Sequence, residues 1–296
     1  MSAKHWTLLL LTAALFGSSF LFIKIAVVEV PPLSLAAARV AIAAVFMVAV
    51  LLATGGRLPA PGRNWVPLFV LGALTAALPY FTVAWGQTRI SSSLGGILFA
   101  TIPIFSLFIA PFIVKEERLT GAKLLGVSLA FVGVILAIGP QAFGGLTTQL
   151  AGAAVTLSAA LSYALGNIYA RLQRDLSPMV MATGQLVTGS VILVPLSLIL
   201  DQPVALSLSA GVAASILAVA LLSTALPVLL MFWLVRHAGA TRASILAFFI
   251  PVAAVILGAS VLGEVISSAA FAGFALIVVG ALLATGTISK LVLRAA

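Results

Sequence analysis

The stretch Ile97-Leu98-Phe99-Ala100-Thr101-Ile102-Pro103 returns in the second half of the chain as Ile245-Leu246-Ala247-Phe248-Phe249-Ile250-Pro251, 148 positions later. The same offset relates further positions on both sides of this stretch. Ala77, Leu78, Pro79, Trp85 and Glu116 match Ala225, Leu226, Pro227, Trp233 and Glu264. Solenoid repeats are only about 20 to 50 residues long, so a repeat of half the chain indicates a duplicated membrane bundle.

The composition also indicates a membrane protein. Of the 296 residues, 63% are hydrophobic and 7% are charged, whereas a soluble domain carries about 25% charged residues. The net charge of +9 is spread singly along the chain. Nucleic-acid contacts usually need runs of about 5 to 8 basic residues, so no nucleic-acid partner is predicted. The chain has no cysteines, which excludes disulfides and thiolate metal ligands, and we predict neither a metal site nor a cofactor.

The apolar runs predict transmembrane helices rather than a barrel. A helix that crosses a hydrocarbon core of about 30 Å needs about 20 apolar residues, and continuous runs such as Leu8-Leu9-Leu10-Leu11 lack the alternation of barrel strands. We predict an all-α polytopic membrane protein with ten transmembrane helices, in two inverted five-helix repeats that cover residues 1–140 and 148–289. The predicted spans are 6–28, 33–53, 65–86, 92–114, 121–140, 148–170, 179–200, 211–235, 241–262 and 267–289.

The basic residues predict the orientation. An even number of spans leaves both termini on one side, and most cations gather there. They are Lys4, Arg57, Arg63, Lys115, Arg118, Lys123, Arg171, Arg174, Arg236, Arg242, Lys290 and Arg294. The opposite side keeps Arg89, with Lys24 and Arg39 in the outer parts of the first two spans. The positive-inside rule therefore predicts an inner (plasma) membrane protein with both termini in the cytoplasm, and the matched halves then cross in opposite directions.

Four prolines in two matched pairs are the candidate hinges: Pro79 and Pro227, Pro103 and Pro251. Proline lacks an N–H and displaces the carbonyl four residues back. Such a carbonyl is tolerated in a membrane where a hydroxyl, a packed helix or a water-filled cavity satisfies it. Bends at matching places in two repeats are typical of a transporter's central site; the alternative is that they are ordinary packing kinks.

Polar and aromatic residues at membrane depth are the candidate substrate contacts. They are Phe16, Ser19, Tyr80, Trp85, Thr101, Tyr163, Asn167, Trp233 and Phe248. A mostly apolar cavity with a few hydroxyls and rings suits a small amphipathic molecule and does not suit a bare metal ion. Trp85 and Trp233 fall within a turn of a predicted helix end, where the alternative is an interfacial aromatic anchor.

Charges inside the spans are few. Lys24 and Arg39 are candidate partners for a substrate carboxylate, or alternatively reach the headgroups with their long side chains. The six acids, Glu29, Glu116, Glu117, Asp175, Asp201 and Glu264, all fall at helix ends or in loops. No proton relay through a buried acid is therefore predicted. His5 and His237 also lie near helix ends, so no enzymatic site is predicted.

Glycines seven residues apart mark one face of the fifth span and one face of the tenth. Gly126 and Gly133 fall in the former, and Gly273 and Gly280 fall in the latter. Small residues stacked in this way let helix backbones approach closely. We predict that these spans form scaffold or a dimer face, which leaves a monomer and a homodimer both open.

The segment from Ile97 to Phe105, with Glu116 to Thr120 and Leu125-Gly126 behind it, resembles the EamA-type repeat of the drug/metabolite transporter superfamily. The second half repeats the pattern with Ile250-Pro251, Glu264 and Gly280, so the resemblance covers essentially the whole chain. One departure is Phe16-Gly17, where many relatives carry Trp-Gly. The resemblance implies a ten-helix inverted repeat and export of amino acids or other small metabolites, and among these it is nearest the aromatic amino acid exporters.

Repeat, composition and resemblance together predict a transporter that exports small organic metabolites, above all amino acids, by alternating access around a central cavity. Its expected partners are the small-molecule substrate and membrane lipids. Two alternatives of the same fold stay open, a passive channel and a translocator of lipids or other metabolites.

Overall fold

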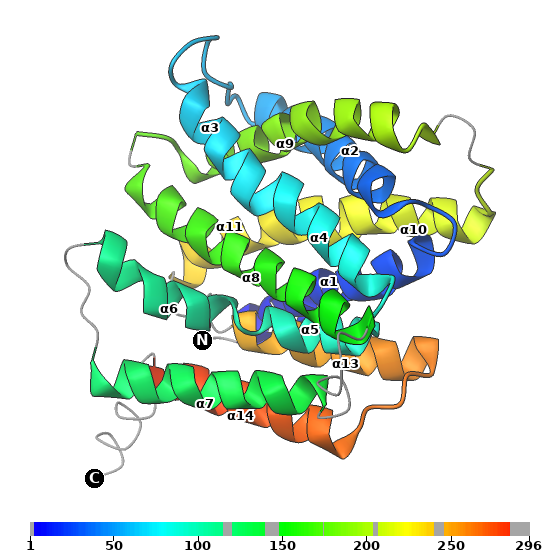
Figure 1. The fold of residues 1–296 in the computed structure, drawn as a ribbon. Coiled ribbons are helices and arrows are strands. Elements are labelled where there is room, and N and C mark those ends of the chain that lie inside the picture. The colour runs from blue at the N-terminus through cyan, green and yellow to red at the C-terminus, as the bar shows by residue number, and fades with distance from the viewer. Residues whose placement is uncertain are drawn as a thin grey trace.

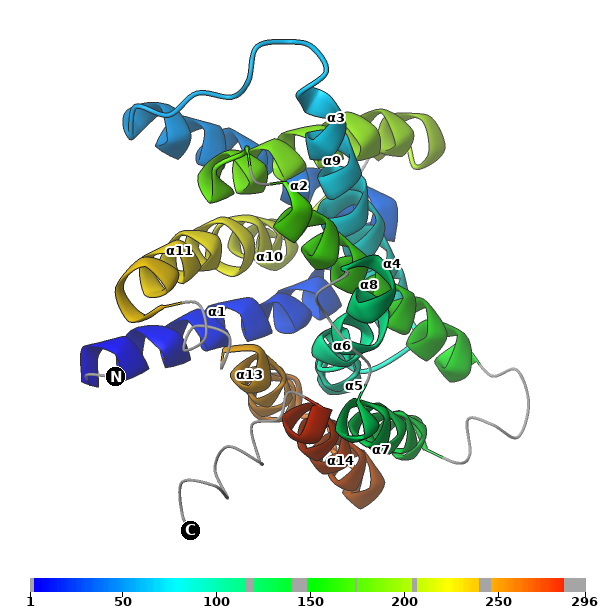
Figure 2. The same ribbon diagram turned by 90° about the vertical axis from the view of Figure 1, so that its left-hand side faces the viewer.

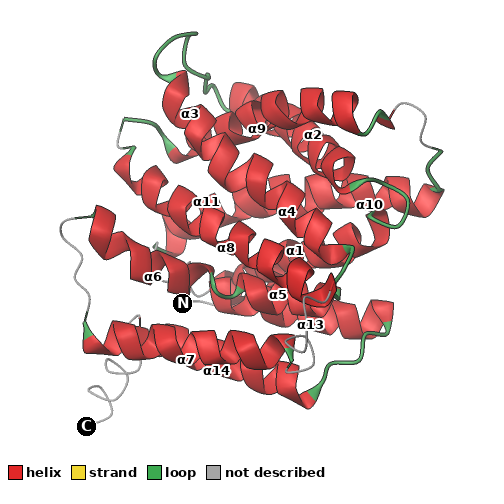
Figure 3. Ribbon diagram, viewed as in Figure 1, coloured by secondary structure: helices red, strands yellow, loops and turns green. Residues whose placement is uncertain are grey.

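The computed structural model describes residues 3–114, 120–139, 148–173, 175–203, 207–239 and 246–284. Throughout these ranges all regular structure is helical (Figure 3). The first half contains α1 (Ala3–Ala26), α2 (Pro32–Ala53), α3 (Trp65–Gly72), α4 (Leu78–Gln87), α5 (Ser92–Phe99), α6 (Ile102–Ile113) and α7 (Gly121–Ile138). The second half contains α8 (Thr148–Leu172), α9 (Pro178–Leu200), α10 (Ala210–Ala220), α11 (Leu226–Ala238), α13 (Leu246–Leu262) and α14 (Ser268–Ala284).

These helices form ten apolar spans, as predicted. Eight are long and apolar enough to cross a membrane, and α13 and α14 are shorter within the described residues. Three spans are made of two consecutive helices each: α3 with α4, α5 with α6, and α10 with α11. Figure 1 shows these spans running roughly along one another through the molecule. The predicted division into ten helices is therefore confirmed.

Local sequence signals explain where several helices begin. Ser91, Ser177 and Ser209 each accept a hydrogen bond from the backbone amide three residues ahead, as N-cap residues do. Pro32 and Pro178 stand at the first turn of α2 and α9, where a missing N–H costs no helical hydrogen bond.

The fifth span of each repeat, α7 in the first and α14 in the second, packs side by side with its counterpart at one edge of the bundle (Figures 1 and 2). A Cβ atom on Gly133 would lie 2.6 Å from the carbonyl oxygen of Gly273, and one on Gly126 would collide with the carbonyl of Gly280. Residue numbers thus rise along one helix as they fall along the other. Because α7 and α14 occupy equivalent places in the two repeats, their antiparallel contact is the arrangement that an inverted repeat requires.

Both halves widen into a π-helical turn just before a matched proline. The first π segment is Ala73–Ala77, which precedes Leu78-Pro79, and the second π segment is Leu221–Ala225, which precedes Leu226-Pro227. In each half, the amide of the leucine before the proline donates a hydrogen bond to the carbonyl oxygen five residues back. A π turn accommodates an extra residue in the helical ladder and frequently marks a functional site.

Hydroxyl groups in the interior satisfy the carbonyls near these π segments. Ser162 on α8 donates through Oγ to the Leu74 carbonyl at 2.7 Å, and Thr224 donates through Oγ1 to the Val219 carbonyl at 2.7 Å. A carbonyl released from a helix in lipid needs such a partner. The two π segments are therefore fixed by side chains that face the inside of the bundle.

The other proline pair behaves asymmetrically. Pro103 follows a break between α5 and α6, where the amides of Ala100 and Thr101 bond to carbonyls only three residues back. Pro251, by contrast, lies inside the continuous helix α13. Only the first half therefore carries a full helix break at this matched place.

Candidate functional site

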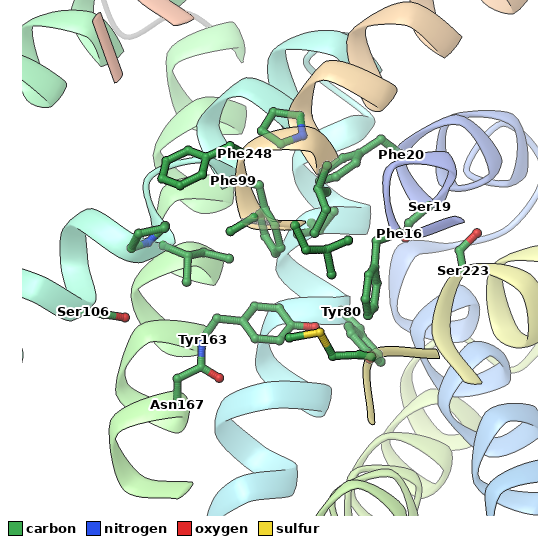
Figure 4. Close-up of a pocket in the computed structure, with 18 of the residues that line it drawn as sticks. Phe16, Ser19, Phe20, Tyr80, Phe99, Ser106, Tyr163, Asn167, Ser223 and Phe248 are labelled. Carbon is green, nitrogen blue, oxygen red and sulfur yellow. The ribbon is translucent and has the colours of Figure 1, made fainter. Parts of the chain in front are cut away.

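A cavity of about 740 Å³ lies between the two halves (Figure 4). The spans that carry the predicted substrate contacts, namely the first, third, fourth, sixth, eighth and ninth, all contribute side chains, and α2 adds Arg39. The lining residues include Phe16, Ser19, Phe20, Arg39, Tyr80, Val83, Phe99, Pro103, Ser106, Leu107, Tyr163, Asn167, Arg171, Ser223, Met231, Leu246, Phe248 and Pro251.

The cavity has an open end and a closed end. The open end is the one where α8 ends and α13 begins; Asn167 and Arg171 line it and are exposed. The closed end points toward the place where α4 ends and α5 begins, and its lining includes the buried side chains of Phe20 and Val83, with Phe99 from the far end of α5. Phe20 is only 3% exposed and Val83 only 4%, whereas Asn167 and Arg171 are exposed, so the cavity opens at the end where α8 ends.

Aromatic rings from four helices, α1, α4, α5 and α8, form one wall. The Phe99 ring meets Tyr163 edge-on with centroids 5.3 Å apart, and meets Phe20 edge-on at 5.4 Å. The Tyr80 and Tyr163 rings lie 6.4 Å apart, and Figure 4 shows the Tyr163 side chain reaching toward Tyr80. Edge-to-face pairs of this kind are the favoured packing of aromatic rings. They give the cavity a mainly apolar, aromatic wall that carries two phenol groups.

Arg39 supplies the cationic group deepest in this wall, and it is 7% exposed. Its guanidinium carbon lies 3.9 Å from the centroid of the Tyr80 ring, a cation–π arrangement. Its Nε donates to Thr224 Oγ1 at 2.8 Å. Within the described part of the chain no carboxylate forms an ion pair with this guanidinium.

The described acids near the closed end serve helix N-termini instead. Asp201 accepts hydrogen bonds from the amide and hydroxyl of Ser34 at the start of α2. Glu29 accepts a 2.8 Å bond from the amide of Ser209, just ahead of α10. Helix N-termini attract anions because their first amides lack helical partners. These carboxylates therefore join neighbouring spans at the closed end.

Of these three carboxylates, Glu264 accepts the most hydrogen bonds from a helix N-terminus. Its carboxylate accepts from the Ser92 amide at 2.7 Å, the Ser93 amide at 2.8 Å and Ser93 Oγ at 2.5 Å. Burial alone raises the pKa of this carboxyl, but the hydrogen bonds from Ser93 and Ser92 outweigh burial, and the pKa ends below its ordinary value. Its repeat partner Glu116 lies outside the described residues.

Six sequence candidates line the cavity: Phe16, Ser19, Tyr80, Tyr163, Asn167 and Phe248. So do two of the four hinge candidates, Pro103 and Pro251, and one of the two cationic candidates, Arg39. Pro79 and Pro227 instead follow the π segments away from the lining.

The other candidates have partners of their own. Thr101 bonds to the Leu98 carbonyl at 2.6 Å. Lys24 donates through Nζ to the carbonyls of Gln87 and Ile90, both at 2.8 Å, and so binds the end of α4. The structure thus separates Lys24 from Arg39, although the sequence treated them alike.

Trp85 and Trp233 occupy matched helix ends with a similar contact. The Arg89 guanidinium lies 3.5 Å over the Trp85 ring, and the His237 ring stacks on Trp233 at 4.1 Å. Each partner stands four residues further along and also bonds the tryptophan carbonyl. This pairing at helix ends accords with the interfacial-anchor alternative for both tryptophans.

The sequence analysis did not select several lining residues, including Phe20, Ser106, Arg171 and Ser223. Helical spacing could have found some of them. Tyr163, Asn167 and Arg171 follow one another at intervals of four on α8, so they share one helix face. Among the described residues no group of three or more His, Asp or Glu side chains could hold a metal ion.

Comparison with known proteins gives consistent matches over the full length. The sequence pattern of the EamA-like transporter family matches residues 4–139 and again residues 150–286. An "Uncharacterized inner membrane transporter YedA" from Escherichia coli (strain K12) is 30% identical, covering 92% of this chain and 87% of that protein. A "Probable amino-acid metabolite efflux pump" from Salmonella typhimurium is 28% identical over 95% of this chain and 94% of that protein.

A relative from Archaeoglobus fulgidus, an "Uncharacterized transporter", is 26% identical over 94% of this chain and 97% of its own length. One solved crystal structure matches with a TM-score of 0.68 and 21% identity, covering 98% of this chain and 99% of the other. At this identity the likeness shows the fold alone. The two matched halves, the ten apolar spans and the relatives agree. The chain is a multi-pass membrane protein, a transporter and not an enzyme, and it belongs to the EamA-like transporter family.

Proposed function

We propose that the protein exports small metabolites that carry a carboxylate, above all amino acids with apolar or aromatic side chains. The proposed mechanism is alternating access, in which the two halves move about the proline bends. The observation that carries the proposal is the buried cation Arg39 in the cavity wall, which has no carboxylate partner in the described part of the chain.

Arg39 supports a carboxylate ligand on energetic grounds. Removing a guanidinium from water is costly unless opposite charge or aromatic faces compensate. The Tyr80 ring and the Thr224 hydroxyl engage one face and one N–H of this group. A substrate carboxylate supplies the missing charge, because the remaining N–H groups of an arginine match two carboxylate oxygens.

The rest of the lining supports the side-chain class. The volume of about 740 Å³ falls in the range of about 300 to 1,000 Å³ found for small-molecule sites. Rings of Phe16, Tyr163 and Phe248 offer apolar and edge-on contacts to a hydrophobic or aromatic side chain. Ser19 and Asn167 offer oxygen atoms to an ammonium group.

The relatives add independent support for amino acids. The protein from Salmonella typhimurium that bears the amino-acid efflux name is matched over nearly the whole of both chains. A protein of that name from Escherichia coli (strain K12) is 32% identical over 57% of this chain. The proposed substrate class thus agrees with both the cavity chemistry and these names.

We further infer an inner-membrane location with both termini in the cytoplasm, following the distribution of lysine and arginine. The open end of the cavity then faces the cytoplasm and the closed end faces outward. In this account the described conformation is the one that loads substrate for export.

Counterflow in liposomes tests the proposal and separates a carrier from a channel. Purified protein is reconstituted, vesicles are loaded with unlabelled phenylalanine or leucine, and entry of the labelled amino acid is followed. We expect preloading to accelerate entry, because a loaded carrier returns faster than an empty one. Entry of label that preloading does not accelerate would favour a channel, and no entry of any amino acid would overturn the substrate assignment.

A further inference from the structure

Behind the closed end of the cavity lies a glutamine side chain that the proposed cavity does not use. Gln87, the last residue of α4, is 0% exposed. Neither its Nε2 nor its Oε1 atom has a hydrogen-bond partner among the residues that the structure describes. Buried amides nearly always have partners, and the exceptions often have a functional explanation.

The Gln87 amide and the Phe20 ring both lie beside Gly95 of α5. A Cβ atom on Gly95 would lie 3.2 Å from the Phe20 ring and 3.4 Å from Gln87 Nε2. The ring and the amide thus both approach α5 at Gly95, which carries no side chain. Phe20 lines the cavity, so the amide lies beside the same glycine as a ring that lines the cavity.

Charges of both signs flank the amide on its outer side. Lys24 Nζ binds the Gln87 and Ile90 carbonyls at 2.8 Å, and the Glu264 carboxylate lies near enough to attract Lys24 electrostatically. Glu264 in turn binds the amides of Ser92 and Ser93. In this conformation both charges are held by helix ends, while the Gln87 amide has no hydrogen-bond partner among the described residues.

We propose that Gln87, between Lys24 and Glu264, forms a second binding station for an α-amino carboxylate, which the substrate occupies after it passes Phe20 on the way out. The amide can donate through Nε2 to a carboxylate and accept through Oε1 from an ammonium group. The positive charge of Lys24 is complementary to the carboxylate, and the negative charge of Glu264 is complementary to the ammonium group. The station rests on the proposed function, because it takes the same zwitterion as the cavity.

The second half of the chain carries an apolar residue at the position that matches Gln87. The position that matches Gln87, 148 residues later, is Val235. Replacing an unpaired buried polar group by an apolar one of similar size is nearly neutral or stabilising for the fold. The Gln87→Leu variant should therefore fold and melt no lower than the wild type, while it loses both hydrogen bonds to substrate.

The test measures transport from each side separately. Gln87→Leu is compared with the wild type in right-side-out and inside-out membrane vesicles, with labelled phenylalanine as the probe. We expect the half-saturation concentration at the closed-end side to rise on the order of tenfold, and that at the open-end side to stay unchanged. The matched control is Gln149→Leu, since Gln149 bonds the Ile138 carbonyl at 3.1 Å away from this path; this variant should leave both values unchanged.

Each outcome decides the proposal. A closed-end value that is unchanged in Gln87→Leu, with the wild type active, would mean that only buried water meets the amide and would overturn the station alone. Equal rises on both sides, or a lower melting temperature with no sided effect, would assign Gln87 a structural role and overturn it too. A wild type that transports no α-amino carboxylate would overturn the proposed function and the station together.

Discussion

Arg39 Nε donates a hydrogen bond to Thr224 Oγ1 at 2.8 Å, which joins α2 of the first half to the second π segment. The same hydroxyl donates to the Val219 carbonyl at 2.7 Å, so one threonine holds both the cation and the widened helical turn. A ligand that pulls on Arg39 therefore acts directly on a matched bend of the second half. This contact links the proposed carboxylate site to the proposed movement.

Replacement of Arg39 tests the carboxylate site. We expect Arg39→Met to lower kcat/KM for phenylalanine on the order of 30-fold or more, since loss of one partner from a desolvated charge pair costs about 2 to 5 kcal/mol. Arg39→Lys keeps the charge but loses the planar guanidinium, which can bind both carboxylate oxygens, and the hydrogen bond to Thr224. It should therefore retain more activity than Arg39→Met but less than the wild type. Tracer counterflow measures both, and wild-type kinetics in Arg39→Met would remove this residue from the site.

Tyr163 tests the aromatic wall. We expect Tyr163→Ala to reduce the preference for phenylalanine over leucine roughly two- to tenfold, because an edge-to-face ring pair contributes about 0.5 to 1.5 kcal/mol. Tyr163→Phe keeps the ring that meets Phe99 at 5.3 Å and should keep most of the preference. Competition between the two amino acids gives the ratio, and an unaltered ratio in Tyr163→Ala would argue against contact with the substrate side chain.

The proline bends are tested by Pro103→Ala and Pro251→Ala. Both variants should fold, since alanine suits a helix, and both should transport more slowly with little change in half-saturation. The effect should be larger for Pro103, because α5 and α6 are separated at this proline whereas α13 runs through Pro251. Efflux rates in proteoliposomes measure the difference, and full rates in both variants would contradict a hinge role.

Glu264 gives a pH dependence whose sign follows from its capping bonds. Its pKa is lowered in the folded protein because hydrogen bonds from Ser93 and Ser92 outweigh burial. The stabilisation is therefore complete above the ordinary carboxyl pKa of about 4.3 and is lost as the pH falls through the lowered value. Between pH 8 and pH 5 this cap should not respond to pH.

The measurement is the melting temperature in detergent, followed from pH 7 down to pH 3. We expect Glu264→Gln to melt lower than the wild type at pH 7 and the two curves to converge as the wild-type carboxylate becomes protonated. A gap that stays constant down to pH 3 would show that the charge of Glu264 does not stabilise the start of α5.

The sequence predicted the ten spans because apolarity and length are local properties, and it placed Arg39 among the candidates because a charge at membrane depth is costly. It could not separate Arg39 from Lys24, since only the packed structure shows that the ends of α4 and α5 lie beside Lys24. Phe20 went unselected because apolar residues surround the α1 helix without a helical period, which leaves no signal for the side that meets a cavity.

Prolines predicted where the helices bend but not the form of the bend. Pro79 and Pro227 follow π segments, Pro103 follows a break, and Pro251 follows neither. The form depends on partners from other helices, such as Ser162, which meets the Leu74 carbonyl. These partners lie far away along the chain, so no local pattern reveals them.

The central claim is that two copies of one helical module cross the membrane in opposite directions. Because the chain has no cysteines, single-cysteine variants report sidedness without background. Thr88 and Arg236 are matched across the halves and both are exposed. A membrane-impermeant maleimide should label Thr88→Cys in intact cells, and should label Arg236→Cys only in inside-out vesicles; labelling of both variants from the same face would contradict the account.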